Sequence, residues 1–121
     1  MKKKILIIDD AEVNQMLLSR MLEKYEVLSA SNGAQGLELV QANADTLALI
    51  ILDIVLPETT GVELLEKIKA DPATMDIPVI VMSAQHQTEE QVMELGAIDF
   101  WRKPFYAAKE IQERVARIVG Y

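Results

Sequence analysis

Cysteine is absent from this chain, and histidine occurs once, at His86. Without cysteine there can be no disulfide framework, no thiolate zinc site and no cysteine nucleophile. A single histidine also excludes the paired histidines of a helical zinc-binding motif. Any metal ion that the chain binds must therefore be held by oxygen atoms.

Positive charge and long apolar runs are also scarce. Twelve Lys and Arg stand against nineteen Asp and Glu, giving a net charge of −7, which disfavours a nucleic-acid surface because phosphate binding needs excess cation. The longest apolar run, residues 47–52, is far shorter than the ~20 residues of a membrane span. The apolar run 5–8 after Lys2–Lys4 is too short for a signal peptide, which needs roughly seven or more such residues. We expect a cytoplasmic protein.

The 121 residues suffice for one hydrophobic core, and we expect a single domain over residues 1–121. Short apolar runs without polar alternation are typical of strands that are buried on both faces of a parallel sheet. The predicted strands are Ile5–Ile8, Glu26–Ala30, Leu47–Leu52, Val79–Met82 and Ile98–Trp101.

Amphipathic segments lie between these strands, and each is long enough for a helix. Helical spacing predicts a buried face made of Val13, Met16, Leu17 and Met21 in the first segment. The turn signals agree with these boundaries: they are Asn32-Gly33, residues 57–61, Asp71-Pro72 and Gly96. The alternation of strand and helix indicates an α/β fold built on a doubly wound parallel sheet.

Polar side chains stand where the predicted strands end. Asp9 and Asp10 follow the first strand, Asp53 the third and Ser83 the fourth, while Lys103 comes two residues after Trp101. In open α/β sheets, ligands bind beyond the carboxyl ends of the strands, at the point where the strand order reverses. We therefore expect these side chains to converge on one crevice.

The charges of this set indicate a cation site. Three carboxylates and one ammonium sum to −2 if all are ionised, and carboxylates this close must bind a cation or take up a proton. Oxygen ligands select Mg²⁺, Mn²⁺ or Ca²⁺, and Mg²⁺ is commonly shared between carboxylates and a phosphate. Asp53 is then the candidate nucleophile, with Ser83 and Lys103 holding the phosphoryl oxygens.

Four segments in this order and spacing resemble the receiver domain of bacterial two-component response regulators. They are Ile7-Ile8-Asp9-Asp10, residues 52–57 with Gly61, residues 78–84, and residues 96–105 with Lys103-Pro104. The resemblance extends from Lys3 to about Val119. It implies a flavodoxin-like fold of five strands in the order 2-1-3-4-5, with helices on both faces.

The resemblance also implies the roles of the site residues. Asp53 would accept a phosphoryl group from the phosphohistidine of a sensor histidine kinase or a phosphotransfer protein. Asp10 would bind Mg²⁺ directly, or Mn²⁺ in its place, with Asp9 close by or acting through water. The remaining metal ligands would be Asp53 and the backbone carbonyl of Val55. Ser83 and Phe100 match the hydroxyl and aromatic positions of the family's switch.

The implied function is a signalling switch that catalyses only its own phosphorylation and dephosphorylation. It would act on an output partner, a fused output domain or a second copy of itself, through the surface formed by the fourth helix, fifth strand and fifth helix. No nucleic acid or membrane partner is expected. The output itself does not follow from these residues.

Three residues depart from the usual pattern. Ala11 stands where many family members have a third acid, and Val55 offers no polar side chain beside the phosphoryl group. Trp101 is large for its strand position, and we interpret it as a half-buried packing residue.

Three alternatives are weaker. An aspartate-nucleophile phosphohydrolase needs a second Asp at position 55, and a nucleotide-binding domain needs a phosphate-binding loop where this chain has Asp9-Asp10. A degenerate receiver, acting only as an interaction module, should have lost some of the five site residues.

Overall fold

The computed structural model describes residues 2–56, 59–83, 89–102 and 108–120, in which strands and helices alternate. The strands are β1 (Lys4–Ile8), β2 (Glu26–Ala30), β3 (Leu47–Asp53), β4 (Val79–Ser83) and β5 (Asp99–Arg102). The helices are α1 (Glu12–Met21), α2 (Gly33–Ala42), α3 (Gly61–Ala70), α4 (Glu89–Glu94) and α5 (Ala108–Val119). Among these residues no helix has the length and apolar character needed to cross a membrane.

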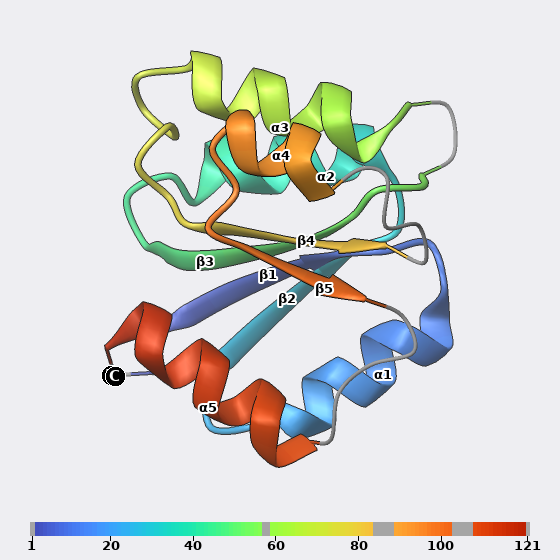
Figure 1. The fold of residues 1–121 in the computed structure, drawn as a ribbon. Helices are drawn as coiled ribbons and strands as arrows, with labels where there is room; N and C mark the ends of the chain where they lie inside the picture. Colours follow the sequence, from blue (N-terminus) through green and yellow to red (C-terminus); the bar gives the residue numbers. More distant parts are fainter. Residues whose placement is uncertain (1, 57–58, 84–88, 103–107, 121) are drawn as a thin grey trace.

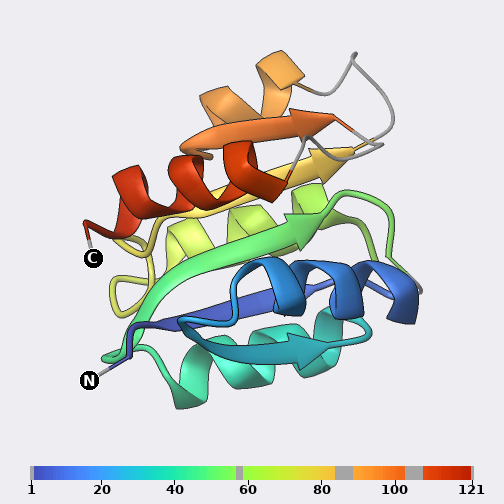
Figure 2. The same ribbon diagram turned by 90° about the horizontal axis from the view of Figure 1, so that it is seen from below.

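The five strands form one parallel sheet in the order β2-β1-β3-β4-β5, so the predicted fold class and strand order are confirmed. Helices α2, α3 and α4 cover one face of the sheet, and α1 and α5 cover the other (Figure 1). Figure 2 views the sheet from the side of α1 and α5. The chain runs from β1 outward to β2 on one side and then crosses over β1 through α2 to reach β3 on the other side, which places the reversal of strand order between β1 and β3.

Apolar side chains fill both layers, because each central strand is buried on both faces. Ile5 and Ile7 of β1 pack toward α1 and α5, whereas Leu6 and Ile8 pack toward the opposite helices. This explains why the strand sequences are continuous apolar runs rather than alternating ones. Strands β3 and β4 extend one residue further than predicted, so Asp53 and Ser83 are the last residues of their strands.

The predicted helix boundaries have clear local causes. The side chain of Asn32 accepts a hydrogen bond from the N–H of Gln35 at 2.8 Å, which caps the start of α2. Thr60 caps α3 in the same way, with the N–H of Glu63 at 3.1 Å. Helix α3 ends at Ala70 because Asp71, which precedes a proline, adopts an extended conformation.

The turn from α4 to β5 depends on Gly96, which has a φ of +109°. A Cβ at this position would also lie 3.4 Å from the aliphatic carbons of Lys69. The Nζ of Lys69 donates to the carbonyls of Met75 and Ile77, at 3.0 and 2.8 Å. Burial lowers the pKa of Lys69, and the nearby Asp76 opposes this lowering. Lys69 thus joins the end of α3 to the loop before β4, and its aliphatic chain lies beside the Gly96 turn.

The predicted buried face of α1 is wrong. Val13, Met16 and Leu17 are 66%, 53% and 44% exposed, and Met21 is only partly buried. The helix instead buries Leu18, and Leu22 follows on the same face just beyond its end. Two polar residues, Asn14 and Gln15, occupy the inward side of the first turns, and this displaces the apolar pattern from which the face was predicted.

Trp101 is fully buried rather than half-buried, in the layer between the sheet and α5. Its indole N–H donates to Asp99 Oδ2 at 2.9 Å, and the guanidinium of Arg114 on α5 reaches the same oxygen at 3.0 Å. The carboxylate of Asp99 therefore satisfies the indole and allows the whole ring to be buried. The same contact fastens α5 to β5.

Candidate functional site

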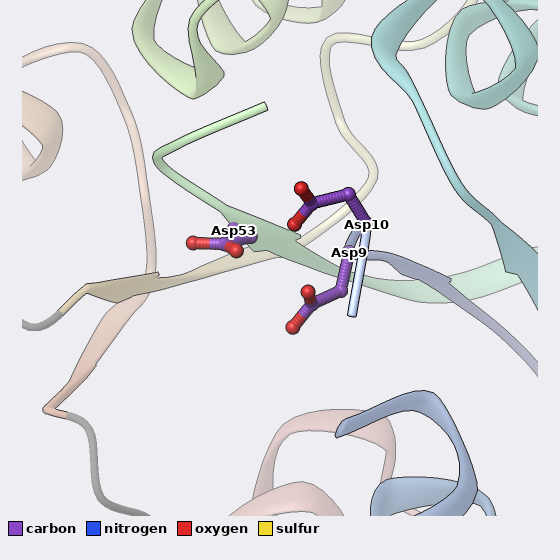
Figure 3. Close-up of side chains that lie close together, drawn as sticks. All are labelled: Asp9, Asp10 and Asp53. Atoms are coloured by element: carbon purple, nitrogen blue, oxygen red, sulfur yellow. The ribbon is translucent and has the colours of Figure 1, made fainter. Parts of the chain in front are cut away.

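Three carboxylates meet at the carboxyl ends of the central strands. Asp9 and Asp10 follow β1, and Asp53 ends β3, which is the neighbour of β1 across the reversal of strand order (Figure 3). One oxygen from each carboxylate lies within 4.8 Å of the others. Asp9 and Asp53 are 0% and 4% exposed, whereas Asp10 is open to solvent. The predicted convergence of these three residues is therefore present in the structure.

The carboxylate of Asp9 is held by the start of α1. Its Oδ1 accepts the N–H of Ala11 at 2.9 Å, and its Oδ2 accepts the side-chain amide of Asn14 at 3.0 Å. Next to Asn14, the side-chain amide of Gln15 donates to the backbone carbonyls of Asp9 and Ala30, at 2.6 and 3.0 Å. Neither amide was among the site residues predicted from the sequence. The sequence feature that could have indicated them is the adjacent polar pair Asn14 and Gln15, early in the helix that follows Asp9 and Asp10.

Asp53 is fixed by the sheet and by the chain that returns to it. The register pairs it with Met82 of β4, whose carbonyl accepts the N–H of Ile54 at 3.0 Å. The N–H of Gly61 donates to the carbonyl of Ile54 at 2.7 Å. A Cβ on Gly61 would lie 2.5 Å from the carbonyl oxygen of Asp53, so glycine is required for this close return.

Val55 lies beside this cluster, at the start of the loop between β3 and α3. Its N–H makes a long contact of 3.3 Å with Asp53 Oδ1, and its backbone pairs with Thr60 through an antiparallel bridge. Its side chain is 65% exposed. An apolar, β-branched side chain thus stands at the open edge of the cluster.

The remaining predicted residues lie toward β5. Ser83 ends β4 and is 1% exposed. Phe100 of β5 is 6% exposed and belongs to the core cluster on the α4 side, together with Val81 and Val92. The alternation of strand side chains puts Ser83 on this same face, two residues beyond Val81. Lys103 and the adjacent Pro104 lie outside the described residues, as does His86.

The donor set fits a hard divalent cation. The cluster offers carboxylate oxygens from three residues, and two ligands on opposite sides of Mg²⁺ lie about 4 Å apart, so small movements would bring these oxygens around one ion. A carboxylate trio carries a charge of −3 when ionised, and a divalent cation would offset most of it. The open position of Asp10 leaves room for water and for an incoming phosphoryl group.

A family model described as the response regulator receiver domain matches residues 5–116. The chain belongs to this family. It is 34% identical over 123 residues to the alkaline phosphatase synthesis transcriptional regulatory protein PhoP of Bacillus subtilis, an alignment that covers 98% of this chain and 49% of PhoP. This receiver domain spans about half the length, or less, of the curated relatives it matches.

Solved structures agree with the family assignment. A response regulator receiver domain protein from Clostridium thermocellum superposes with a TM-score of 0.85 at 27% identity, covering 98% of this chain and 94% of the other. The receiver domain of a sensor histidine kinase from Pseudomonas aeruginosa PAO1 has a TM-score of 0.83 at 25% identity, with both chains fully covered. That structure was solved with a magnesium ion coordinated in its active-site cleft.

The different settings of Asp9 and Asp10 predict different effects of replacing them. Both Asp9→Ala and Asp10→Ala remove one like charge from the cluster, which favours the metal-free fold. Asp9→Ala additionally leaves the N–H of Ala11 and the amide of Asn14 without their acceptor. We expect Asp9→Ala to be less stable than Asp10→Ala by about 1–2 kcal/mol, as judged by urea unfolding in EDTA.

The wild-type chain is the reference for this comparison, because added Mg²⁺ should stabilise it more than either variant. Equal stability of the two variants in EDTA would show that the hydrogen bonds to Asp9 contribute little. A large destabilisation by Asp10→Ala would instead make Asp10 a structural residue.

Proposed function

We propose that this receiver domain, as a single domain over residues 1–121, is a phosphoacceptor switch of two-component signalling. Asp53 takes a phosphoryl group from the phosphohistidine of a sensor histidine kinase or phosphotransfer protein in the cytoplasm. The observation that carries the proposal is the meeting of Asp9, Asp10 and Asp53 at the reversal of strand order in a member of this family. The chain acts on itself rather than turning over a separate substrate.

The chemistry follows from the positions of these groups. A carboxylate oxygen of Asp53 attacks phosphorus, the P–N bond of the phosphohistidine breaks, and the imidazole nitrogen leaves with the electron pair. Asp9, Asp10, Asp53 and the carbonyl of Val55 would hold Mg²⁺, or Mn²⁺ in its place. When bound there, the ion would supply positive charge against the phosphoryl oxygens. The magnesium found in the related Pseudomonas aeruginosa receiver supports this assignment.

Ser83 and Lys103 complete the proposed site. Phosphorylation changes the charge at Asp53 from −1 to about −2 and adds acceptor oxygens that need donors. The buried hydroxyl of Ser83 stands at the end of the strand next to Asp53 and can provide one of them. The ammonium group of Lys103 provides the other in this proposal.

Incubation with acetyl phosphate and Mg²⁺ should add one phosphoryl group to the wild-type chain, detected as an increase in intact mass. Asp53→Asn should lose the label because the amide is a poor nucleophile, and EDTA should prevent labelling of the wild type. Asp45→Asn is the matched control, since it removes an acid outside the cluster and should label normally. Labelling of Asp53→Asn at the wild-type rate would contradict the proposal.

An apolar surface beside the site suits the docking of the phosphodonor protein. We define the α1 strip as Val13, Met16 and Leu17, which are exposed side chains on the helix that begins two residues after Asp10. Exposed apolar groups gathered on one helix face are typical of a protein contact. A partner seated on the α1 strip would bring its phosphohistidine close to the open side of the cluster.

Replacement of Met16 by Lys should slow phosphotransfer from a histidine kinase that phosphorylates the wild-type chain by tenfold or more, because it places a charge in an apolar contact. Labelling by acetyl phosphate should be unchanged, since a small donor needs no docking surface. Met75→Lys is the matched control, because Met75 is similarly exposed at 47% but lies in the loop between α3 and β4. If Met16→Lys and Met75→Lys slowed phosphotransfer from the kinase equally, the α1 strip would not be the docking surface.

The proposed switch uses Ser83 and Phe100. If the Ser83 hydroxyl moves toward the phosphoryl group, it leaves space on the α4 side that Phe100 fills. Phe100 is already buried on that side in this structure, so the inward position does not require the phosphoryl group. Phosphorylation would then increase the population of an arrangement that exists beforehand, with a coupling of about 1–3 kcal/mol. The reshaped surface of α4, β5 and α5 would be read by an output partner, a fused domain or a second copy.

NMR spectra of the free chain and of its complex with Mg²⁺ and beryllofluoride, a phosphoryl mimic, would test the switch. We expect shifts at Asp53 and also along α4 and around Phe100. Ser83→Ala should keep the shifts near Asp53 but weaken the remote ones, because it removes the hydroxyl that links the two places. Shifts that stay within the loops around Asp53 in the wild type would contradict the switch and favour a simple phosphate acceptor.

A further inference from the structure

Asn14 occupies an unusual place for an asparagine. It is the third residue of α1, in the first turn, rather than at the N-cap position that asparagine favours and that Ala11 occupies here. It also faces inward and is partly buried, on the side of the helix that carries Leu18 one turn later. An apolar residue would suit this position better on packing grounds alone. The reason for an amide here must therefore lie in what the amide contacts.

The contact is the carboxylate of Asp9. We define the Asp9 clasp as the two donors of α1 that bind it: the N–H of Ala11 on Oδ1 at 2.9 Å and the Nδ2 of Asn14 on Oδ2 at 3.0 Å. Two donors on two different oxygens fix the carboxylate about both of its side-chain torsions. Asp10 in the same cluster is exposed. Asp9 is fully buried, and its carboxylate is therefore already oriented before any cation binds.

We propose that Asn14 is a positioning residue for the metal site, which sets the affinity of the receiver domain for Mg²⁺ by orienting Asp9. This proposal rests on the proposed function, because it concerns the same cation. Three carboxylates whose oxygens lie within 4.8 Å repel one another, so an unrestrained Asp9 would turn away from the cluster. The clasp opposes this movement during folding, and the cation then meets a site that is partly assembled. Partners that orient metal ligands typically change metal affinity by roughly 10–100-fold when they are removed.

A second effect acts in the opposite direction. A hydrogen bond to Oδ2 draws electron density from that oxygen and competes with the cation for it. The Asn14 amide binds Oδ2 alone, so any competition with the cation is confined to that oxygen, whereas the orientation of the carboxylate sets the position of both oxygens. We therefore expect orientation to dominate and the loss of Asn14 to weaken Mg²⁺ binding.

Gln15 provides a matched control in the next position of the helix. Its amide is also partly buried and also binds the end of β1, but it donates to the backbone carbonyls of Asp9 and Ala30 rather than to the carboxylate. Removing the Gln15 amide should weaken the attachment of α1 to the sheet. Removing the Asn14 amide should affect the carboxylate directly.

The experiment compares Asn14→Leu with Gln15→Leu in the full chain, by calorimetric titration with MgCl₂ alone and by thermal unfolding in EDTA. Leucine keeps the approximate size of each side chain and removes the amide. Asn14→Leu should bind Mg²⁺ about tenfold more weakly than the wild type, whereas Gln15→Leu should stay within about twofold. Asn14→Ala serves as a second variant if Asn14→Leu does not fold.

Two further readouts separate positioning from general structural damage. With acetyl phosphate, Asn14→Leu should need more Mg²⁺ for half-maximal labelling but should reach the wild-type rate at saturating Mg²⁺. In the wild type, addition of Mg²⁺ should shift the NMR signals of the Asn14 side-chain amide but not those of Asn32 and Asn43, the two other asparagines of the chain. Those two amides lie at the cap of α2 and at the end of α2, where they bind other groups.

The outcomes distinguish this proposal from the proposed function. A wild-type chain that neither binds Mg²⁺ nor accepts a phosphoryl group would overturn both. Binding by the wild type with unchanged affinity in the Asn14 variants would overturn the role of Asn14 alone. Tighter binding by Asn14→Leu would show that the amide competes with the cation, and equal weakening by Gln15→Leu would assign the effect to the attachment of α1.

Discussion

The repulsion between three carboxylates at the ends of β1 and β3 is the constraint on which the rest of this structure depends. Their oxygens lie within 4.8 Å of one another, and two of the three side chains are almost fully buried. Such an arrangement persists only if the surrounding fold holds it together. The parallel pairing of β1 with β3 sets the spacing of the strands, the start of α1 binds Asp9, and the return of the chain at Gly61 fixes the end of β3. A divalent cation at this cluster would offset the repulsion between the ionised carboxylates.

Much of this arrangement could be predicted from the sequence because two strong patterns coincide. The runs around Ile5–Ile8 and Leu47–Leu52 have no polar alternation, and such runs require helices on both faces of the sheet. Each run ends at an acid, which a buried strand cannot contain without a function or a partner. The position of Asp53 beside Asp9 and Asp10 followed from these ends together with the reversal of strand order. That order came from the family resemblance rather than from the residues themselves.

The orientation of α1 could not be predicted because its pattern is determined by hydrogen bonds as well as by apolar burial. Periodicity analysis assigns the apolar side chains to the core, and by that rule Val13, Met16 and Leu17 belong inside. The helix turns instead so that Asn14 and Gln15 reach the ends of the strands, and their amides satisfy polar groups that would otherwise be buried without partners. The complete burial of Trp101 could not be predicted for the same reason. It depends on a hydrogen bond, in which the carboxylate of Asp99 accepts the indole N–H.

Because side chains alternate along each strand, the carboxylates of Asp9 and Asp53 lie on the opposite face of the sheet from the Ser83 hydroxyl. Ile7 of β1 and Ile51 of β3 face α1 and α5, so Asp9 and Asp53, two residues further along, begin on that same side. Val81 and Phe100 face α4, and Ser83 shares their side. A group bound at Asp53 would stand between the proposed cation site, supported by α1, and the Ser83 hydroxyl, which the core beneath α4 supports. In the proposed mechanism, the phosphoryl group can contact both the cation and the Ser83 hydroxyl, so phosphorylation couples the two faces more directly than cation binding by itself.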